Sequence, residues 1–441
     1  MDTAAPDTAP PDTAAPGTAV PELDPAAVAR WRESGGELVD LLTAVRRLGG
    51  VSGFRLGDRR VVLVTAPEAV HHVLALHPDR YVKRSHRLKA VLGDGMIAAS
   101  GERWRTQRRV MQAQFTGQGV RRYDGLMRDA VAEIAARWTG AARTGEPRDV
   151  AADMRHFSLD VIWRSMTGRP LDPTTHREFL AAGRMVAALP AFAPATGEAP
   201  PDLTAELAQI DAVAARAIAA AREWPGPSLL HVLLAAAEEH PEYTERLIRD
   251  ELVTLLAAGY ETTATTLSWL FLLLHENPAE RDRALATPPG SAERGTAIRA
   301  LISETLRLYP AAWIMPRHAE REDVLAGYRV EAGTTILTSP YLTHRDDTAW
   351  PDPERFRPDR FAATAPRPAP GAYYPFGLGP RTCLGVQFGL REMTLLLETL
   401  LPAFTVVPHT TPAPTFGVTV RPDGPLTATI TPVRTAEPLD G

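Results

Sequence analysis

The chain has 441 residues, a formal net charge of −5 and a composition that is 44% hydrophobic and 23% charged. This composition is ordinary for a globular protein with a large core, and the acidic balance argues against a nucleic-acid-binding protein. No run approaches the roughly 18 apolar residues that span a bilayer, and no secretory signal is recognised. We therefore expect a cytoplasmic, monomeric protein that binds neither nucleic acid nor a membrane.

The first part of the chain predicts a tail and a small β region. The chain opens with three near-copies of the pentapeptide Asp-Thr-Ala-Ala-Pro. Because such a segment has little to bury, we expect residues 1–22 to be disordered and residues 23–441 to form one domain. Phe54–Leu56 and Val61–Val64 flank the turn Gly57-Asp58, and this pattern predicts a β-hairpin.

The middle of the chain predicts helices almost throughout. Thr65-Ala66-Pro67 is typical of a helix start, and this helix should end near residue 76. From about residue 102 to residue 310, apolar residues recur with the i, i+3, i+4 spacing of a helix that has one buried face. Segments with this spacing are 122–140, 150–167, 203–222, 245–276 and 296–308, with Pro/Gly-rich breaks near 189–202 and 224–227.

The last part of the chain mixes strands with one helix. Val324–Val330 and Thr334–Ser339 predict strands joined by a short turn, and a Pro-rich coil is expected over 351–375. A helix over about 384–401 and strands within 404–432 complete the chain. The fold class we predict is mostly α with small β-sheets. Strands and helices do not alternate, and no P-loop or G-x-G-x-x-G motif follows a strand, so a nucleotide-binding domain is not expected.

The one cysteine, Cys383, lies in the segment Pro375-Phe376-Gly377-Leu378-Gly379-Pro380-Arg381-Thr382-Cys383-Leu384-Gly385. A single cysteine excludes internal disulfides and metal sites built from several cysteines. The segment predicts a rigid turn before a helix, and Arg381 and the helix N-terminus both favour an ionised sulfur that binds a metal. A buried, unreactive cysteine and a catalytic nucleophile remain alternatives on these grounds.

At every fixed position of F-G-x-G-x-R-x-C-x-G, this segment resembles the heme-binding loop of the cytochrome P-450 superfamily, and the chain resembles its soluble bacterial members. The resemblance implies the P-450 fold, in which heme b lies between a long distal helix and the cysteine loop. It implies that Cys383 binds the heme iron as a thiolate, in a loop that includes Phe376, Gly377, Arg381 and Gly385. Thiolate ligation favours cleavage of the O–O bond.

The predicted helix 245–276 is interrupted by Ala258-Gly259-Tyr260-Glu261-Thr262-Thr263. A threonine can hydrogen-bond to the carbonyl four residues earlier, here that of Ala258, so we expect a loosened helix beside a cavity. A threonine-rich packing face is the alternative. The pattern matches the P-450 motif A-G-x-E-T-T. This implies that O₂ binds beside Gly259, that Ala258 and Thr262 face the iron, that Thr262 hydrogen-bonds the bound oxygen and that Glu261 relays protons.

Four residues resemble the P-450 ligands of the heme propionates. Trp104 and Arg108 are spaced i, i+4 on one helix face, and an indole N–H and a guanidinium can both bind a carboxylate. Arg317 and Arg381 resemble the other two ligands. Without the order of the motifs along the chain, each arginine would be interpreted as a surface charge.

Three more residues resemble the structural ion-pair network of the superfamily. Glu304 and Arg307 are spaced i, i+3 on one helix, and Arg360 matches the third member. Because Leu301, Ile302, Leu306 and Leu308 flank the pair, it is expected to be partly buried. The predicted role is structural.

The expected substrate pocket is assigned by position. The residues assigned to it are Met96, Ile97, Ala98, Trp313, Ile314, Phe416 and Val418. They are apolar with one indole, which favours a medium-sized hydrophobic or aromatic secondary metabolite as substrate. The basic cluster Lys83, Arg84, His86, Arg87 and Lys89 is interpreted as a solvated face, with contact to a polar group of the substrate as the alternative.

The resemblance implies a heme-thiolate monooxygenase that activates O₂ and hydroxylates, cyclises or couples its substrate. Two electrons are expected from a ferredoxin and its reductase, docked by Arg105, Arg109 and Arg391. A peroxide-driven heme peroxygenase and a non-redox helical binding protein are the alternatives. A terpene cyclase is disfavoured because the sequence Arg345-Asp346-Asp347-Thr348-Ala349-Trp350 lacks the last acid of D-D-x-x-D.

Overall fold

The computed structural model describes residues 17–84, 89–188, 204–223, 226 and 228–433. The chain forms two compact units, each assembled from segments that are far apart in the sequence. The first unit comprises Met1–Arg84, Ile314–Pro353 and Pro368–Thr382, and the second comprises Ser85–Trp313, Glu354–Arg367 and Cys383–Gly441. The chain therefore passes from one unit to the other inside the cysteine loop, and a single domain over 23–441 stays a prediction.

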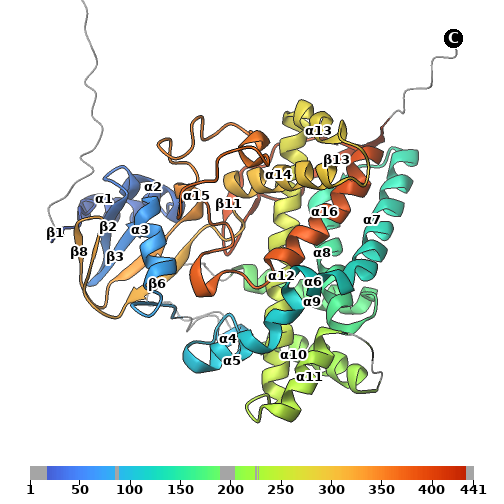
Figure 1. Ribbon diagram of the computed structural model, residues 1–441, viewed down its shortest axis with the longest axis horizontal. Helices are drawn as coiled ribbons and strands as arrows, with labels where there is room; N and C mark the ends of the chain where they lie inside the picture. Colours follow the sequence, from blue (N-terminus) through green and yellow to red (C-terminus); the bar gives the residue numbers. More distant parts are fainter. Residues whose placement is uncertain (1–16, 85–88, 189–203, 224–225, 227, 434–441) are drawn as a thin grey trace, which may run out of the picture. The chain divides into compact units, whose positions relative to one another are not determined.

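The first unit is built on a five-stranded sheet (Figure 1). β2 (Val51–Leu56) and β3 (Arg59–Val64) form an antiparallel hairpin, and β3 pairs in parallel with β9 (Thr335–Thr338). β9 pairs antiparallel with β6 (Met315–Ala319), which pairs with β4 (Tyr81–Val82). Their β-branched and aliphatic residues pack into one buried apolar cluster.

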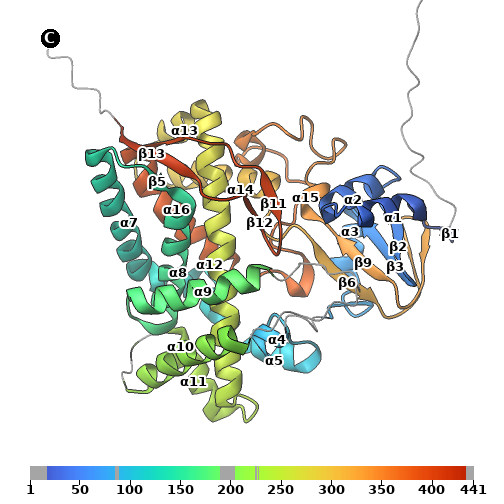
Figure 2. The same ribbon diagram turned by 180° about the vertical axis from the view of Figure 1, so that it is seen from behind.

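A second, three-stranded sheet of this unit has the order β1 (Thr18–Ala19), β8 (Tyr328–Val330) and β7 (Asp323–Leu325). Short helices complete the unit, and Figure 2 shows α1 and α2 beside β2 and β3. The helices are α1 (Pro25–Glu33), α2 (Leu38–Arg46), α3 (Pro67–His71), the π-helix η1 (His72–Leu76), α15 (Pro340–Thr343) and the 3₁₀-helix η5 (Gly379–Arg381).

Two predictions for this unit are confirmed and two need correction. The hairpin is present as β2 and β3, and the helix expected to end near residue 76 is present as α3 followed by η1. The tail to residue 22 is too long, because β1 is a strand and Val20 is buried in the core; residues 1–16 lie outside the described part of the chain. The strand expected over Val324–Val330 is a hairpin, because Ala326 and Gly327 have the positive φ values, 45° and 86°, of a tight turn.

The second unit is mostly helical with two small sheets. Its sheets are β10 (Phe404–Pro408), β13 (Thr427–Pro432) and β5 (Arg148–Asp149), and the hairpin of β11 (Pro414–Phe416) and β12 (Val420–Pro422). Its 3₁₀-helices are η2 (Ala113–Phe115), η3 (Arg121–Tyr123) and η4 (Pro358–Phe361). Its α-helices are α4 (Lys89–Leu92), α5 (Gly101–Gln112), α6 (Gly117–Val120), α7 (Asp124–Thr144), α8 (Val150–Thr167), α9 (Pro173–Ala188), α10 (Thr204–Glu223), α11 (Leu229–Glu239), α12 (Glu245–Glu276), α13 (Pro278–Leu285), α14 (Ala292–Leu308) and α16 (Val386–Ala403).

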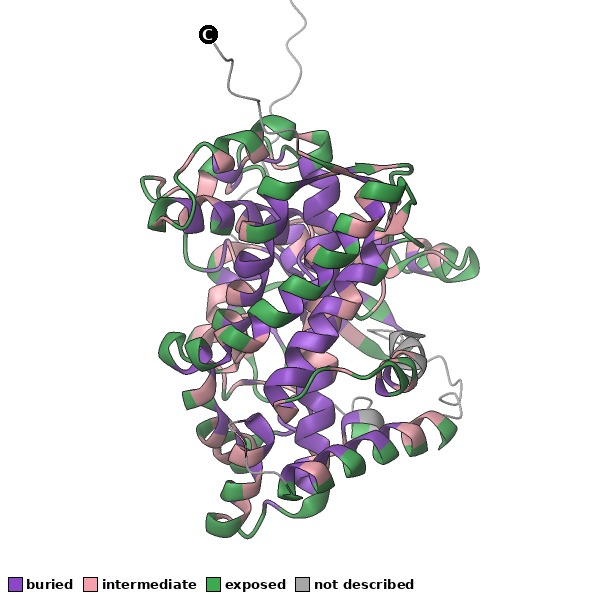
Figure 3. Ribbon diagram, turned by 90° about the vertical axis from the view of Figure 1, so that its right-hand side faces the viewer, coloured by how far each residue is buried: buried purple, intermediate pink, exposed green. Residues whose placement is uncertain are grey.

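The helix α12 is the core element of the second unit and contacts α8, α10, α14 and α16. The hydroxyl of Thr244 caps its start by accepting the N–H of Leu247 at 3.3 Å. Most residues of α12 are buried, as expected of a helix inside the core of a large protein. Figure 3 shows this burial, with buried residues along the inner helices and exposed residues on the outer helix faces.

The predicted fold class is confirmed, because the described residues are mostly helical with small sheets. The five helices predicted from periodicity are present as α7, α8, α10, α12 and α14. The Pro/Gly-rich breaks lie mainly outside the described residues. Among the helices that the structure describes, none combines the length and the hydropathy that a membrane span requires.

Candidate functional site

The cysteine loop begins in the first unit with two glycines in the left-handed region, Gly377 (φ 72°) and Gly379 (φ 68°). A Cβ at Gly379 would lie 2.3 Å from the carbonyl oxygen of Leu74, which belongs to η1. The hydroxyl of Thr382 closes the turn by donating to the Gly379 carbonyl at 2.7 Å. Backbone geometry therefore explains why this loop needs glycine at position 379.

Cys383 itself is exposed and precedes the start of α16 by one short turn. Desolvation raises the pKa of the thiol above its ordinary value, and the Gly385 N–H, which donates to the sulfur, and the positive charge of Arg108 offset only part of this rise. The sulfur therefore has open surface, a backbone N–H donor and a nearby cation. These are the surroundings in which a thiolate can act as a metal ligand.

Three cationic side chains of the first unit interact with one another. Lys83 follows β4, Arg317 lies on the adjacent strand β6, and Arg381 precedes the end of the cysteine loop. Desolvation, together with the charges of Arg317 and Arg381, lowers the pKa of Lys83 to about 7. Desolvation also lowers the pKa of Arg317 to about 10. Positive charges that are close together and partly removed from water favour binding of an anion beside them.

The interpretation of the basic cluster as a solvated face is therefore wrong for Lys83. It fits Arg84 and Lys89, which are exposed and pair with acidic side chains. His86 and Arg87 lie outside the described residues. The sequence could not separate Lys83 from its neighbours, because only the pairing of β4 with β6 brings it to Arg317.

Trp104 and Arg108 both lie on α5, one turn apart, and both are half-buried. Desolvation lowers the pKa of Arg108, and its interaction with Cys383 raises it. The predicted i, i+4 pair is therefore present on one helix, and its arginine interacts electrostatically with the cysteine.

The middle of α12 has one accessible window. Residues 250–256 and 263–274 are buried, whereas residues 257–259, 261 and 262 are half-buried. The window coincides with the A-G-x-E-T-T motif. An otherwise buried helix with open surface at this stretch leaves room beside Ala258 and Thr262, which share one helix face.

The hydroxyl of Thr262 donates to the carbonyl of Ala258 at 2.7 Å, as predicted. Thr266 repeats the pattern with the carbonyl of Thr262 at 2.9 Å. The predicted loosening is wrong, because α12 stays a regular α-helix through the motif. A carbonyl oxygen has two lone pairs and can accept both a hydroxyl and a backbone N–H. The bond leaves the lone pairs of the Thr262 hydroxyl available to accept a further hydrogen bond.

Glu261 lies in the same window and hydrogen-bonds with the hydroxyl of Tyr260. Burial first, and then the charge and hydrogen bond of Glu261, raise the pKa of Tyr260 above its ordinary value. Because the phenol therefore keeps its proton, it is the donor and the Glu261 carboxylate is the acceptor. The ring of Tyr260 is held edge-on to Phe179, with centroids 5.6 Å apart.

Gly259 allows α8 to approach α12 closely. A Cβ at this position would lie 3.2 Å from Cγ1 of Ile162 on α8, which is tighter than ordinary contact. The structure therefore gives Gly259 a packing role between two helices. Its predicted place beside O₂ stays a prediction.

A buried acid that the sequence motifs did not single out is Glu392, on the helix that follows the cysteine. Its Oε1 accepts a hydrogen bond from the hydroxyl of Thr263 at 2.7 Å, and only 1% of the residue is exposed. Burial raises the pKa of Glu392 to about 8, so the carboxyl is protonated at neutral pH. The only signal in the sequence is an acid within the apolar run of α16.

The structure brings Glu304, Arg307 and Arg360 together in the second unit. Arg307 donates to both carboxylate oxygens of Glu304, through Nε at 2.7 Å and Nη2 at 2.8 Å, and both residues are fully buried. Arg360 Nε lies 3.4 Å from Glu304 Oε1, and the backbone N–H of Arg357 donates to the same oxygen at 2.7 Å. The predicted grouping is present, and the charges are compensated inside the protein.

Comparison with known proteins identifies the family to which this chain belongs. The family model for cytochrome P450 matches residues 29–286 and 293–427. The chain belongs to the cytochrome P450 family. Two relatives come from Streptomyces melanosporofaciens. Cyclooctatin synthase is 30% identical and covers 90% of each chain, and cyclooctat-9-en-7-ol 5-monooxygenase is 31% identical over 87% of this chain and 88% of its own.

Solved structures agree with this assignment. CYP175A1 from Thermus thermophilus is 30% identical, covers 93% of this P450 and 100% of its own chain, and has a TM-score of 0.74. The cytochrome P450 CYP102L1, at 23% identity, has a TM-score of 0.80 and supports the fold. This P450 is accordingly an oxidoreductase of the monooxygenase class.

Membership of the family implies heme iron, and the residues of this P450 fit that group. The sulfur of Cys383 is accessible and has an N–H donor beside it, which suits a thiolate ligand of iron. The desolvated cations Lys83 and Arg317, with the positive charge of Arg381 near Lys83, suit a carboxylate-bearing group.

The residues expected around the substrate fall into two groups in this P450. Met96 and Ala98 are buried and Ile97 is half-buried, in a segment that is tied to α12 through the Met96 N–H. Ile314 belongs to the first unit and is half-buried. These side chains are apolar, as predicted, and their contact with substrate stays a prediction.

The second group is the C-terminal hairpin of β11 and β12. Trp313 is buried, and its indole N–H donates to the carbonyl of Gly417 at 2.8 Å. Its ring is nearly perpendicular to that of Phe416, with centroids 5.1 Å apart. Val418, at the tip, is 41% exposed. Trp313 therefore anchors the hairpin, and Val418 is the member with the most open surface.

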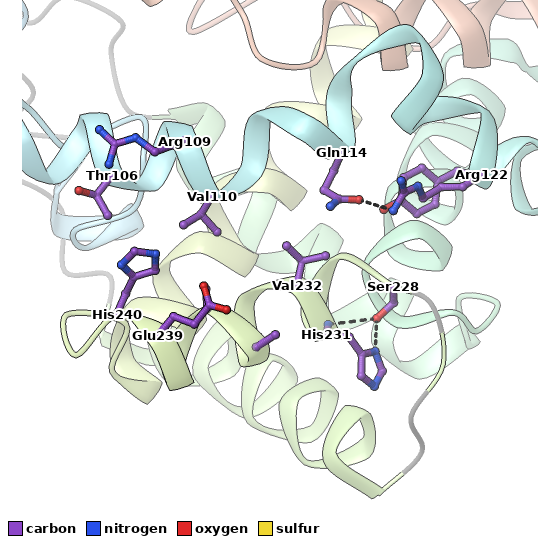
Figure 4. Close-up of a pocket in the computed structure, with 13 residues that line it drawn as sticks. Thr106, Arg109, Val110, Gln114, Arg122, Ser228, His231, Val232, Glu239 and His240 are labelled. Atoms are coloured by element: carbon purple, nitrogen blue, oxygen red, sulfur yellow. Dashed lines mark hydrogen bonds between the residues drawn. The ribbon is translucent and has the colours of Figure 1, made fainter.

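This P450 also has a cavity of about 520 Å³ between α5 and α11, which the sequence did not predict (Figure 4). Val110 and Val232 provide apolar lining from the two helices. Arg122 donates to Gln114 at 2.8 Å. None of the motif residues lines this cavity.

Proposed function

We propose that this P450 binds heme b through Cys383, activates O₂ and oxidises a hydrophobic secondary metabolite with two electrons from an external donor. The observation that carries the proposal is the sulfur of Cys383, which is accessible and has the Gly385 N–H and the Arg108 charge beside it. The complete heme-loop motif and the family match support the same assignment.

The heme carboxylates would be bound by Trp104 and Arg108 on α5 and by Arg317 and Arg381, with Lys83 next to these two arginines. A carboxylate beside Lys83 would restore its positive charge, because an opposite charge raises the pKa that desolvation and the two arginines lower. When bound, a thiolate-ligated heme supplies the electronic activation of O₂.

The contribution of the chain itself is proton delivery by Thr262 and Glu261. The Thr262 hydroxyl donates a hydrogen bond to the Ala258 carbonyl, so its oxygen is oriented to accept a hydrogen bond. The half-buried Glu261 can exchange protons with solvent at its carboxylate. A positioned alcohol next to an acid is the expected pair for supplying the protons that O₂ reduction consumes.

The proposed substrate class follows from the apolar residues at positions 96–98 and on the hairpin of β11 and β12. A pocket with mainly apolar lining favours a medium-sized hydrophobic molecule. The named relative that oxidises cyclooctat-9-en-7-ol supports hydroxylation of such a molecule. We therefore propose hydroxylation as the default reaction, with oxidative ring closure or coupling drawing on the same chemistry.

The proposed electron donor is a ferredoxin with its ferredoxin reductase. Of the three arginines expected to bind it, Arg109 is exposed, whereas Arg105 pairs with Glu102 and Arg391 pairs with Asp124. We therefore assign the main docking contribution to Arg109. Reversing its charge should slow the first electron transfer and weaken its dependence on salt, because exposed complementary charges act mainly on association.

An absorption spectrum of the reduced, CO-treated protein tests the proposal. A thiolate-ligated heme gives a strongly red-shifted Soret band, and C383S should lose it. T382S is the matched control, because serine keeps the hydroxyl that bonds to Gly379. A colourless wild-type protein after expression with ample iron and porphyrin, or an unchanged band in C383S, would show that the proposal is wrong.

Replacing Thr262 separates O₂ activation from direct use of peroxide. T262A should lower coupled, O₂-dependent turnover by about 10²-fold, the lower end of what a positioned proton donor contributes. Turnover driven by added peroxide should fall much less. Equal losses in both assays would contradict the role assigned to this hydroxyl.

A further inference from the structure

The segment Gly93–Ala99, here called the strap, lies against the first half of α12 within the second unit. Figure 2 shows α4 and α5, which flank the strap, next to α12. Two backbone N–H groups of the strap donate to neighbouring carboxylates on the helix. The N–H of Asp94 donates to Asp250 Oδ2 at 2.8 Å, and that of Met96 donates to Glu251 Oε2 at 3.2 Å.

Two glycines allow the strap to lie this close to α12. A Cβ at Gly93 would be 2.1 Å from Oδ2 of Asp250, and one at Gly95 would be 2.1 Å from Oγ1 of Thr254. Gly95 would also meet the backbone carbonyl of Asp250 at 2.6 Å. No side chain fits at either position without moving the strap away from the helix.

The strap is also held from its other side and within itself. The side chain of Gln107, on α5, donates to the carbonyl of Asp94 at 2.8 Å. The N–H groups of Ala98 and Ala99 both donate to the carbonyl of Gly95, at 2.8 and 3.0 Å. The backbone at Met96 is therefore fixed by the Glu251 carboxylate and by the turn in which Ala98 and Ala99 bond to Gly95.

The two carboxylates that hold the strap differ in their surroundings. Asp250 pairs with the guanidinium of Arg249 at 2.9 Å. Glu251 is fully buried, and its second oxygen, Oε1, has no hydrogen-bond partner among the described residues. The buried hydroxyl of Tyr243, which interacts electrostatically with Glu251, also has none. Burial raises the pKa of Glu251 to about 7, so an amide is a close stand-in for its neutral form.

Glu251 shares a face of α12 with the residues of the oxygen motif. Positions 251, 258 and 262 are separated by seven and eleven residues, which are close to whole numbers of helical turns. Ala258 and Thr262 therefore lie about 10 Å and about 16 Å further along the same face. The strap, which carries Met96, Ile97 and Ala98, contacts α12 at Asp250, Glu251 and Thr254.

We propose that Glu251 is a positioning residue that fixes the strap on α12 and so sets which molecules fit beside Ala258 and Thr262. This inference rests on the proposed function, because the strap matters for selectivity only if the substrate lies at the oxygen motif. Removing the carboxyl should release the Met96 N–H and change selectivity for ligand size, with little effect on the heme or on small ligands.

Azoles of different size test the proposal in the holoenzyme. Imidazole and clotrimazole bind heme iron through a ring nitrogen, and optical titration gives both dissociation constants. In E251A the ratio of the two constants should change by about tenfold, which corresponds to about 1.4 kcal/mol. E251Q should restore the ratio to within about threefold of wild type, because the amide oxygen still accepts the Met96 N–H.

Two more variants guard against a general folding effect. G95A should shift the ratio as E251A does, because the added methyl group would clash with Thr254 and Asp250 on α12 and push the strap away from the helix. E245Q is the matched control, since Glu245 is an exposed acid on α12 that pairs with Arg222 and does not touch the strap. An unchanged ratio in both E251A and G95A, or an equal change in E245Q, would overturn the proposal.

Hydrogen exchange of the peptide that spans residues 93–99 separates this proposal from the proposed function. Exchange in the strap should be faster in E251A than in wild type and E251Q. Faster exchange with an unchanged azole ratio would overturn the selectivity role. A wild-type protein that binds no azole would overturn the proposed function, whereas the hold of Glu251 on the strap would still be measured by exchange.

Discussion

Two ion pairs of the second unit have the same residues and the same spacing but very different surroundings. Glu102 and Arg105 on α5 are 72% and 54% exposed, with a single contact of 3.1 Å. Glu304 and Arg307 on α14 are fully buried and make a bidentate contact. The sequence motif E-x-x-R is therefore the same in both places, and burial alone separates a structural element from a surface pair.

Buried acids of the same unit extend the comparison. Glu304 accepts hydrogen bonds from a guanidinium and from a backbone N–H. Within the described part of the chain, Glu392 accepts the hydroxyl of Thr263 and Glu251 accepts the N–H of Met96, and neither acid pairs with an arginine. Burial raises the pKa of both acids. A buried carboxyl without an arginine takes up a proton more readily, because burial then disfavours its charged form without compensation.

The largest effect should come from removing Arg307. R307M leaves the Glu304 carboxylate buried with a weaker set of partners, and breaking such a pair costs about 3–5 kcal/mol. The midpoint of urea unfolding of the holoenzyme, followed by tryptophan fluorescence, should fall accordingly. The double variant E304L/R307M should recover part of the loss, and a midpoint like that of wild type in R307M would refute the comparison.

The next effect is a pH dependence due to Glu392. Its pKa is about 8 in the folded state and 4.5 in the reference state, so the folded protein holds a proton that the unfolded chain releases between these values. Stability should therefore fall as the pH rises from 4.5 to 8, by up to about 1.4 kcal/mol per pH unit. In E392Q this part of the slope should be absent in urea unfolding at pH 5, 6 and 7. A slope equal to that of wild type would contradict the buried, neutral acid.

A smaller effect should follow from removing the hydroxyl that bonds to Glu392. T263V deletes one buried hydrogen bond, which costs about 0.5–1.5 kcal/mol. Because that bond lowers the pKa of Glu392, its loss should also raise this pKa further and extend the fall in stability to higher pH. Unfolding at pH 7, 8 and 9 measures both effects, and T266V is the control because its hydroxyl bonds within α12.

The smallest effect should come from the exposed pair. R105Q should change stability by about 0.5 kcal/mol or less, the usual value for a solvated i, i+3 pair. The same urea assay applies, at low and high salt. A loss close to that of R307M would mean that exposure does not separate the two pairs.

Much of the fold could be predicted because its signals are local. The hairpin of β2 and β3 surrounds a Gly-Asp turn, and α12 shows a long apolar pattern with a threonine that bonds back to Ala258. The residues of Glu304–Arg307 are neighbours on one helix, so their contact follows from spacing. The regular helix through the A-G-x-E-T-T motif could not be foreseen, because the same threonine bond is compatible with a bulge and with an intact helix.

The contacts that sequence reasoning missed join residues that are far apart in the chain. Lys83 meets Arg317 only because β4 pairs with β6, and Glu392 meets Thr263 only because α16 packs on α12. Glu251 accepts a hydrogen bond from the backbone N–H of Met96. Almost every residue type has a backbone N–H, so the sequence does not show which one is the donor. Such contacts depend on tertiary packing, which periodicity does not encode.

The π-helix η1 makes the cysteine loop sensitive to chain length at a place outside its own motif. The carbonyl of Leu74 lies directly under Gly379, and a π turn holds one more residue than an α turn. Deleting a single residue within His72–Leu76 would leave too few residues for the π turn, so the turn would rewind as an α turn and move the Leu74 carbonyl relative to Gly379. The cysteine loop would then lose its packing against the Leu74 carbonyl, although its own sequence motif would be unchanged. When sequences of this family are aligned, a gap at these five positions is therefore as strong a warning as a substitution in the signature itself.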